Sequence, residues 1–212
     1  MAEKHIIINV GRQLGSGGHD IGRMLASDFH AKYYDRELLN LAAKESGFSE
    51  KFFEQNDERK GFFKGLFNMG SPHVNSGSVY KSSVSQESLF QFQSDAIIKA
   101  ASEGSCVFVG RCADYVLRDF PNAVNIFITA SMSYRVEQIM NKQHLDEAAA
   151  KAFIEKRESQ RAEYYNYYTG KKWGHAASYD LCIDSSILGI METEKIIAEF
   201  IRKRFGLNPR RS

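Results

Sequence analysis

The segment that decides the fold is NVGRQLGSGGHDIGRML, residues 9–25, which directly follows the apolar run HIII at residues 5–8. The apolar run predicts a strand, and the residues from His19 onward predict a helix. Between them lie three glycines in four residues, Gly15, Gly17 and Gly18. Glycine lets the backbone turn tightly and approach a ligand. Because the free N–H groups of the helix would face this turn, the segment predicts a phosphate-binding loop.

Two phosphate-loop patterns compete for this segment. The dinucleotide pattern G-x-G-x-x-G would need glycine at position 20, where the chain has Asp20, although Asp35 lies about where the ribose-binding acid of that pattern would stand. The Walker pattern G-x-x-x-x-G-K-[ST] would need lysine at 18 and serine or threonine at 19, where the chain has Gly18 and His19. Neither pattern matches in full, so the loop by itself leaves both kinds of nucleotide binding open.

Short apolar runs alternate with longer helical patterns along the chain. Such alternation predicts an α/β fold with a parallel sheet covered on both faces, whose ligands lie beyond the carboxyl ends of the strands. The expected strands are residues 5–10, 32–35, 106–110, 124–129 and 179–184. Two stretches depart from the alternation. Residues 60–88 are rich in glycine and serine and predict a long loop, and residues 156–174 are dense in Arg, Lys and Tyr and could fold over a ligand.

Composition narrows the class of protein. The net charge of +2 is too small to imply binding to nucleic acid or to a membrane surface, and no run of apolar residues is long enough to span a bilayer. The cysteines, Cys106, Cys112 and Cys182, are odd in number and lack the spacing of a zinc site. We therefore expect a cytoplasmic protein whose partners are small molecules, with neither nucleic acid nor membrane among them.

Several segments together resemble the cytidylate kinase-like family of nucleoside monophosphate kinases. They are GRQLGSGGHDIGRMLA, YYDRELL, VFVGRCADYVL, FPNAVNIFITAS, RAEYYNYYTGKKWG and YDLCIDSS, which extend over nearly the whole chain. The resemblance implies an α/β P-loop NTPase fold: a five-stranded parallel sheet with helices on both faces, a monophosphate-binding insertion and a lid. It also implies one domain over residues 1–212, with the insertion at about 36–105 and the lid at about 156–174. ATP and Mg²⁺ would be the cofactors, and CMP or dCMP the acceptor.

The resemblance assigns the donor side to the glycine-rich segment. The loop of cytidylate kinases proper resembles G-P-A-G-S-G-K-G-T and aligns through Gly15-Ser16-Gly17, so its lysine falls on Gly18 and its magnesium-binding threonine on Asp20. Arg12 is then a candidate catalytic residue that replaces the lysine, unless it is a surface residue at the strand end; a protonated His19 is the other candidate. Asp20 is the candidate metal ligand, although an acid in the first turn of a helix explains it equally well. The cofactor-binding set is Gly15, Ser16, Gly17, Gly18, His19, Asp20 and Arg135.

The acceptor side is assigned to residues that follow two strands. Gly110-Arg111 resembles the G-R-D-x-G segment whose arginine binds the acceptor phosphate, a task that suits the planar guanidinium fork. Asp114 could orient Arg111 or meet the base, or form a salt bridge only. Asp35 and Arg36 could contact the acceptor or order the insertion, with helix capping as the alternative for Asp35.

The lid would add further positive charge. Arg157 and Arg161 are four residues apart, so they would share one face of a helix, and both are candidate catalytic residues that stabilise the transferring phosphoryl group. A solvated charged helix is the structural alternative for this stretch.

Three functions remain. The first is phosphoryl transfer from ATP and Mg²⁺ to a nucleoside monophosphate or a related phosphate-bearing acceptor. The second, suggested by Gly18 in place of lysine, is nucleotide binding without kinase activity. The third, a nicotinamide-dependent oxidoreductase, rests on the glycines and Asp35 alone.

Overall fold

The computed structural model describes residues 5–36 and 79–207. In the helix that begins at Val79, side chains are described from Glu87 onward. The contacts divide the chain into two compact units, residues 1–36 with 97–212, and residues 37–96. Most of the expected 60–88 loop lies outside the described residues. Its end, however, is helical from Val79, as the start of α5 (Val79–Glu103). The prediction of a loop was wrong there because serine lowers helix propensity only slightly and does not prevent a helix.

The first unit contains a five-stranded parallel sheet with the order β2-β3-β1-β4-β5. The strands are β1 (Ile7–Arg12), β2 (Lys32–Tyr34), β3 (Cys106–Val109), β4 (Ala123–Thr129) and β5 (Leu181–Asp184). All five expected strands are present. Because the strands are parallel, their carboxyl ends meet at one edge, which brings the residues after β1, β3, β4 and β5 close together.

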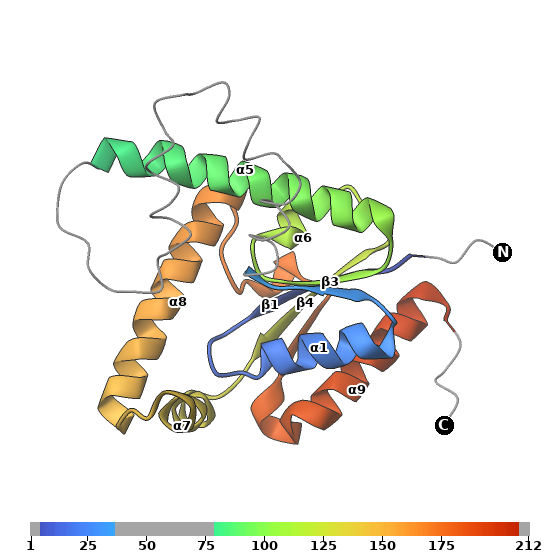
Figure 1. Cartoon of the computed structure of the whole chain (residues 1–212). Helices are drawn as coiled ribbons and strands as arrows, with labels where there is room; N and C mark the ends of the chain where they lie inside the picture. Colours follow the sequence, from blue (N-terminus) through green and yellow to red (C-terminus); the bar gives the residue numbers. More distant parts are fainter. Residues whose placement is uncertain (1–4, 37–78, 208–212) are drawn as a thin grey trace. The chain divides into compact units, whose positions relative to one another are not determined.

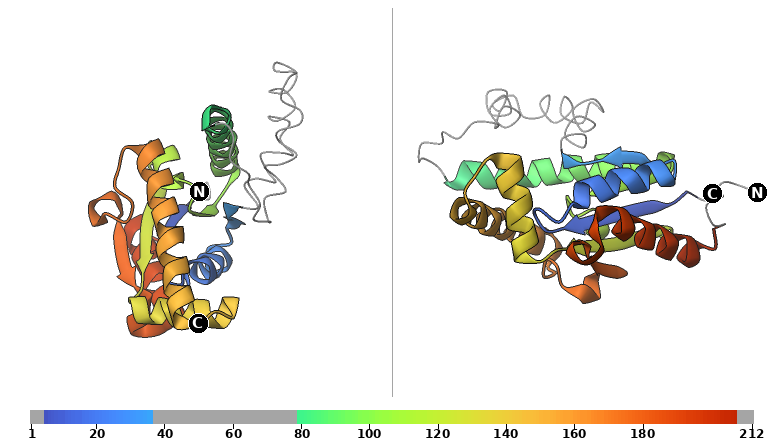
Figure 2. Two further views of the ribbon diagram at one scale, coloured as in Figure 1. Left: turned by 90° about the vertical axis from the view of Figure 1, so that its left-hand side faces the viewer. Right: turned by 90° about the horizontal axis from the view of Figure 1, so that it is seen from below.

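Helices cover both faces of this sheet (Figure 1). On one face, α1 (Gly18–Asp28) and α9 (Ser185–Phe205) pack against each other and on the strands. The short α6 (Ala113–Val116) and the last turns of α5 lie on the other face. Beyond the carboxyl edge, α7 (Met132–Gln143) packs on α8 (Glu147–Thr169), as the two views in Figure 2 also show.

Successive side chains of a strand point to opposite faces of the sheet, and this creates an apolar layer on each face. In β1, Ile8 and Val10 join the core beneath α1 and α9, whereas Ile7 faces the opposite layer, in which Phe108 and Phe127 are also buried. Helices cover both faces of the sheet, which explains why the inner strands are nearly continuous apolar runs in the sequence.

The expected lid stretch is mostly the second half of α8. Asp146 caps the start of α8 by accepting a hydrogen bond from the N–H of Ala149, and Gly170 ends it in the left-handed conformation. A small apolar cluster around Ile139 and Ile154 fastens α8 to α7. The searched helices among the described residues include none that is long and apolar enough to cross a membrane.

Candidate functional site

The glycine loop, residues 13–18, follows β1 and leads into α1. Gly15 and Gly17 have φ angles of 82° and 73°, a region that side chains disfavour. The N–H of Ile21 is bonded to the carbonyl of Gly17 at 3.0 Å, and no side chain caps the helix. The preceding N–H groups, at residues 18–20, therefore have no carbonyl within the helix to bind. The loop and helix end offer these donors, with the positive end of the helix dipole, to an anion such as a phosphate.

Hydrogen bonds hold the loop in this shape. Ser16 donates from Oγ to the carbonyl of Gln13 at 2.9 Å. Ser185, the first residue of α9, places its Oγ 2.7 Å from the carbonyl oxygen of Ser16 and 3.1 Å from that of Thr129. Ser16, expected to bind the cofactor, is fully buried, so its side chain supports the loop from within.

Arg12 ends β1, and its side chain runs between two glycines. A Cβ atom at Gly18 would lie 2.6 Å from the Cβ of Arg12, and a Cβ at Gly110 would lie 2.2 Å from Nη1 of Arg12. Side chains at either position would collide with it. Gly18, expected to align with the lysine of cytidylate kinases proper, is therefore the residue that makes room for Arg12. The Nε atom of Arg12 is buried and has no hydrogen-bond partner among the described residues.

A cluster of positive charge, which we call the arginine cluster, consists of Arg12, Arg111 and Arg161. Arg161 comes from α8 and donates to the carbonyl oxygen of Arg12 at 3.3 Å. Burial, followed by the charges of Arg161 and Arg111, lowers the pKa of Arg12 to about 9. Burial also lowers the pKa values of Arg111 and Arg161. A bound anion would relieve the mutual repulsion of these three guanidinium groups.

His19 lies in the first turn of α1, beside Arg12. Its Nε2 is 3.3 Å from Nη2 of Arg12, and its Nδ1 is 3.0 Å from the hydroxyl of Tyr33. Burial and the charge of Arg12 lower the pKa of His19 to about 4, while Asp35, beyond β2, raises it. Burial and the neighbouring charge of Arg12 therefore disfavour a protonated His19 at neutral pH, and the guanidinium of Arg12 itself supplies positive charge there.

Arg111 and Asp114 follow β3 in a turn of unusual backbone. Gly110, Arg111 and Cys112 all have positive φ angles, 82°, 60° and 56°. The guanidinium of Arg111 lies over the ring of Tyr164 at 5.2 Å. Asp114 accepts a hydrogen bond of 2.6 Å from the hydroxyl of Tyr165, and burial raises the pKa of its carboxyl. Strained residues often cluster at functional sites, and here the turn directs Arg111 toward α8.

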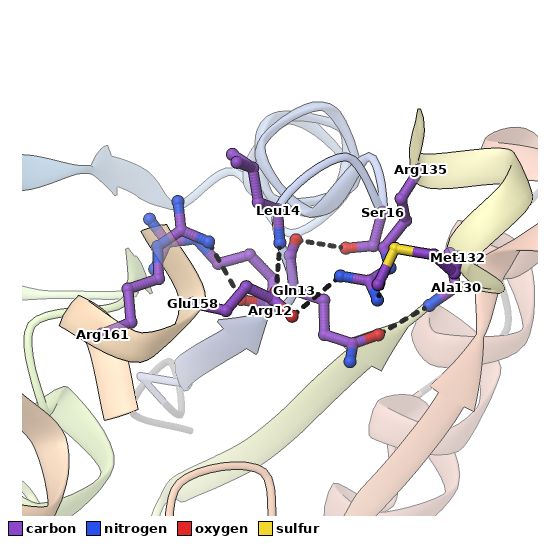
Figure 3. Close-up of polar contacts among 9 residues, drawn as sticks. All are labelled: Arg12, Gln13, Leu14, Ser16, Ala130, Met132, Arg135, Glu158 and Arg161. Carbon is purple, nitrogen blue, oxygen red and sulfur yellow. Dashed lines mark hydrogen bonds and ion pairs between the residues drawn. The ribbon is translucent and has the colours of Figure 1, made fainter. Parts of the chain in front are cut away.

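Arg135 does not join the glycine loop as a free cation. It is buried, and its Nη1 lies 2.8 Å from Oε2 of Glu158 on α8. The other carboxylate oxygen of Glu158 accepts from the N–H of Leu14 at 2.9 Å, as Figure 3 shows. Arg135 and Glu158 thus connect α7, α8 and the start of the glycine loop, and the guanidinium expected to grip the donor is engaged inside the protein.

Three further expected residues are exposed. Arg157 is exposed, with its guanidinium over Phe153 at 5.2 Å, so only Arg161 of the two α8 arginines reaches Arg12. Arg36 is exposed, and its charge lowers the pKa values of Arg111 and Arg161. Asp20 is exposed in the first turn of α1. Among the residues searched there is no group of three or more metal-ligating His, Cys, Asp or Glu side chains.

Sequence reasoning missed Tyr33 and Glu158. They are separated by 14 and 144 residues from His19 and Leu14, their partners in the site. The only available signal for Glu158 was its place three residues before Arg161, which puts both on one face of a helix.

Comparisons with known proteins bear on the family and the fold of this chain. The sequence profile of the cytidylate kinase-like family matches residues 7–187. The chain belongs to the cytidylate kinase-like family. No curated protein matches the chain.

Three solved structures resemble the fold. An uncharacterized protein from Eubacterium ventriosum is 27% identical with a TM-score of 0.72, over 94% of this chain and 99% of that one. Shikimate kinase from Bacteroides thetaiotaomicron is 11% identical, with a TM-score of 0.52 over 95% and 99% of the two chains. A gluconokinase from Sinorhizobium meliloti is 11% identical, with a TM-score of 0.50 over 95% and 94%. The five-stranded fold of this chain is accordingly that of P-loop kinases, and the expected fold class is confirmed.

Proposed function

We propose that this protein transfers a phosphoryl group from ATP to a nucleoside monophosphate, with CMP or dCMP as the first acceptors to test. The observation that carries the proposal is the arginine cluster beside the glycine loop, at the carboxyl edge of the sheet. Two phosphate-bearing ligands that meet there would bring several negative charges together. Three guanidinium groups, each able to donate two parallel hydrogen bonds, suit that charge.

The donor would bind through its phosphates to the glycine loop and to the N–H groups at the start of α1. Arg12 takes the role of the missing lysine, because its side chain crosses the space above Gly18 and ends beside the same helix start. Mg²⁺, when bound, would supply further charge neutralisation between the donor phosphates. Asp20 is the residue that would hold it, and a single carboxylate suits an ion that keeps several waters and phosphate oxygens as ligands.

The acceptor phosphate would bind to Arg111, and Arg161 would stand between donor and acceptor. An acceptor phosphate is a nucleophile without prior deprotonation at neutral pH. Positioning and charge stabilisation therefore suffice for transfer, and no general base needs to be assigned. Asp114, held by Tyr165, lies three residues after Arg111 and would contact the base or sugar of the acceptor.

ADP release tests the proposal. Purified protein is mixed with Mg²⁺ and ATP and with CMP, dCMP, UMP, AMP or GMP, and a sample without acceptor gives the background. We expect turnover that depends on a monophosphate, and Arg111→Ala should raise the KM for that acceptor more than it lowers kcat. Arg118→Ala, an exposed arginine seven residues later, is the matched control. Turnover with none of the monophosphates would reject the proposal.

A second candidate is nucleotide binding without phosphoryl transfer, favoured by Gly18 in the lysine position. It predicts that ATP binds in a calorimetric titration while no acceptor causes ADP release. The same samples therefore distinguish the two candidates.

A further inference from the structure

The imidazole of His19 connects two side chains from different strands. A guanidinium can only donate hydrogen bonds, so Nε2 of His19, 3.3 Å from Nη2 of Arg12, must act as the acceptor and carries no proton. A neutral imidazole then holds its proton on Nδ1, which donates to the hydroxyl oxygen of Tyr33 at 3.0 Å. The contacts on both sides thus fix the tautomer of His19.

The protonated form of His19 does not fit this arrangement. An imidazolium would point a second N–H at the guanidinium and would bring two positive charges into contact. Three cations disfavour that charge, Arg12 on β1, Arg161 on α8 and Lys142 on α7, whereas Asp35, which follows β2, favours it.

Arg12 benefits from a partner that fixes its side chain. It approaches the site from the end of a strand, and fixing its long side chain costs about 2 kcal/mol of rotamer entropy. Gly18 and Gly110 leave room for the side chain on two sides. The imidazole supplies the acceptor that selects one rotamer.

We propose that His19 is a positioning residue: as a neutral acceptor oriented by Tyr33, it holds the guanidinium of Arg12 in place beside the glycine loop. The chain Tyr33–His19–Arg12 runs from β2 through the first turn of α1 to the end of β1. Its effect on catalysis rests on the proposed phosphoryl transfer, whereas the hydrogen-bonding arrangement itself does not.

Nuclear magnetic resonance of the full-length protein tests the arrangement without any turnover. Long-range ¹H–¹⁵N spectra at pH 7 assign the His19 ring by the signal that His19→Gln removes. We expect the proton on Nδ1 and none on Nε2 in the wild-type protein. Arg12→Ala should allow the tautomer with the proton on Nε2 as well, because the guanidinium that donates to Nε2 is gone. A proton on Nε2 of the wild-type ring would overturn the proposal.

A double-mutant cycle tests the positioning role in turnover. We expect His19→Leu to lower kcat by about 10–100-fold with little change in the KM for ATP, since small misplacements of a catalytic group cost that much. In an Arg12→Ala background the same change should lower kcat less than about twofold, because His19 acts through Arg12. His19→Gln, which keeps a neutral acceptor, should restore most of the activity.

His5→Gln, at an exposed histidine outside the site, is the matched control for the cycle. Equal losses from His19→Leu in both backgrounds would mean that His19 acts independently of Arg12, and would overturn the proposal. If the wild-type protein gives no turnover with any acceptor, the proposed function fails, and the tautomer measured at pH 7 still decides whether His19 holds Arg12.

Discussion

Replacing Glu158 by glutamine should destabilise the protein strongly, because it leaves Arg135 buried without its counter-charge. The side chain of Arg135 is only 6% exposed and that of Glu158 17%. Breaking a buried ion pair by removing one partner costs about 3–5 kcal/mol, and we expect about 3 kcal/mol here because Glu158 keeps some contact with water. The amide oxygen of glutamine can still accept the hydrogen bond from Leu14, so the loss reports mainly on the ion pair.

Urea unfolding followed by circular dichroism measures this loss. With an m value of about 2–3 kcal/mol per M, the midpoint should fall by about 1–1.5 M. The melting temperature should fall by about 6–12 °C, since each kcal/mol shifts a chain of this size by about 2–4 °C. The matched control is Glu155→Gln, three residues earlier on α8 at an exposed position, which should change the midpoint very little.

A double variant, Arg135→Met with Glu158→Gln, separates the charge effect from packing. It should lose less stability than the sum of the two single variants, because no uncompensated charge remains buried. If Glu158→Gln shifts the midpoint no more than Glu155→Gln does, the reasoning is refuted, and Arg135 and Glu158 do not hold α8 to the glycine loop.

Two further predictions concern Gly18 and the cysteines. Gly18→Ala should lower kcat by about tenfold or more, because the added methyl group would displace Arg12; Gly104→Ala, where a Cβ meets nothing within 4 Å, should leave acceptor-dependent ADP release unchanged. In a thiol-reagent assay at pH 8, exposed Cys182 should react rapidly in the native protein, whereas Cys106 and Cys112 should react only after unfolding. Burial raises the pKa values of those two thiols to about 11 and about 12, so little thiolate forms. Rapid reaction of all three native thiols would contradict the described packing.

The sequence alone was sufficient to predict the sheet and the glycine loop. The three inner strands, β3, β1 and β4, were visible as short apolar runs, because strands covered on both faces are mostly apolar. The strand, the glycines and the helix start of residues 9–25 follow from local backbone preferences, which act over a few residues. Arg111 at the end of β3 was also predictable, since parallel strands gather their carboxyl ends at one edge.

Only the tertiary structure decided how the charged side chains are used. Arg135 was expected at the donor, but its partner Glu158 lies 23 residues away on another helix. Arg157 and Arg161 were equivalent in the sequence, and the docking of α8 brings only Arg161 to Arg12.

The same holds for the glycine at position 18. In the sequence, Gly18 stands where a lysine is expected. In the fold, its lack of a side chain leaves the space that Arg12 occupies. Local preferences determine where strands and loops form, whereas the order β2-β3-β1-β4-β5 determines which distant residues meet. Side-chain roles at the carboxyl edge depend on that order, because charge and burial act through space and are independent of distance along the chain.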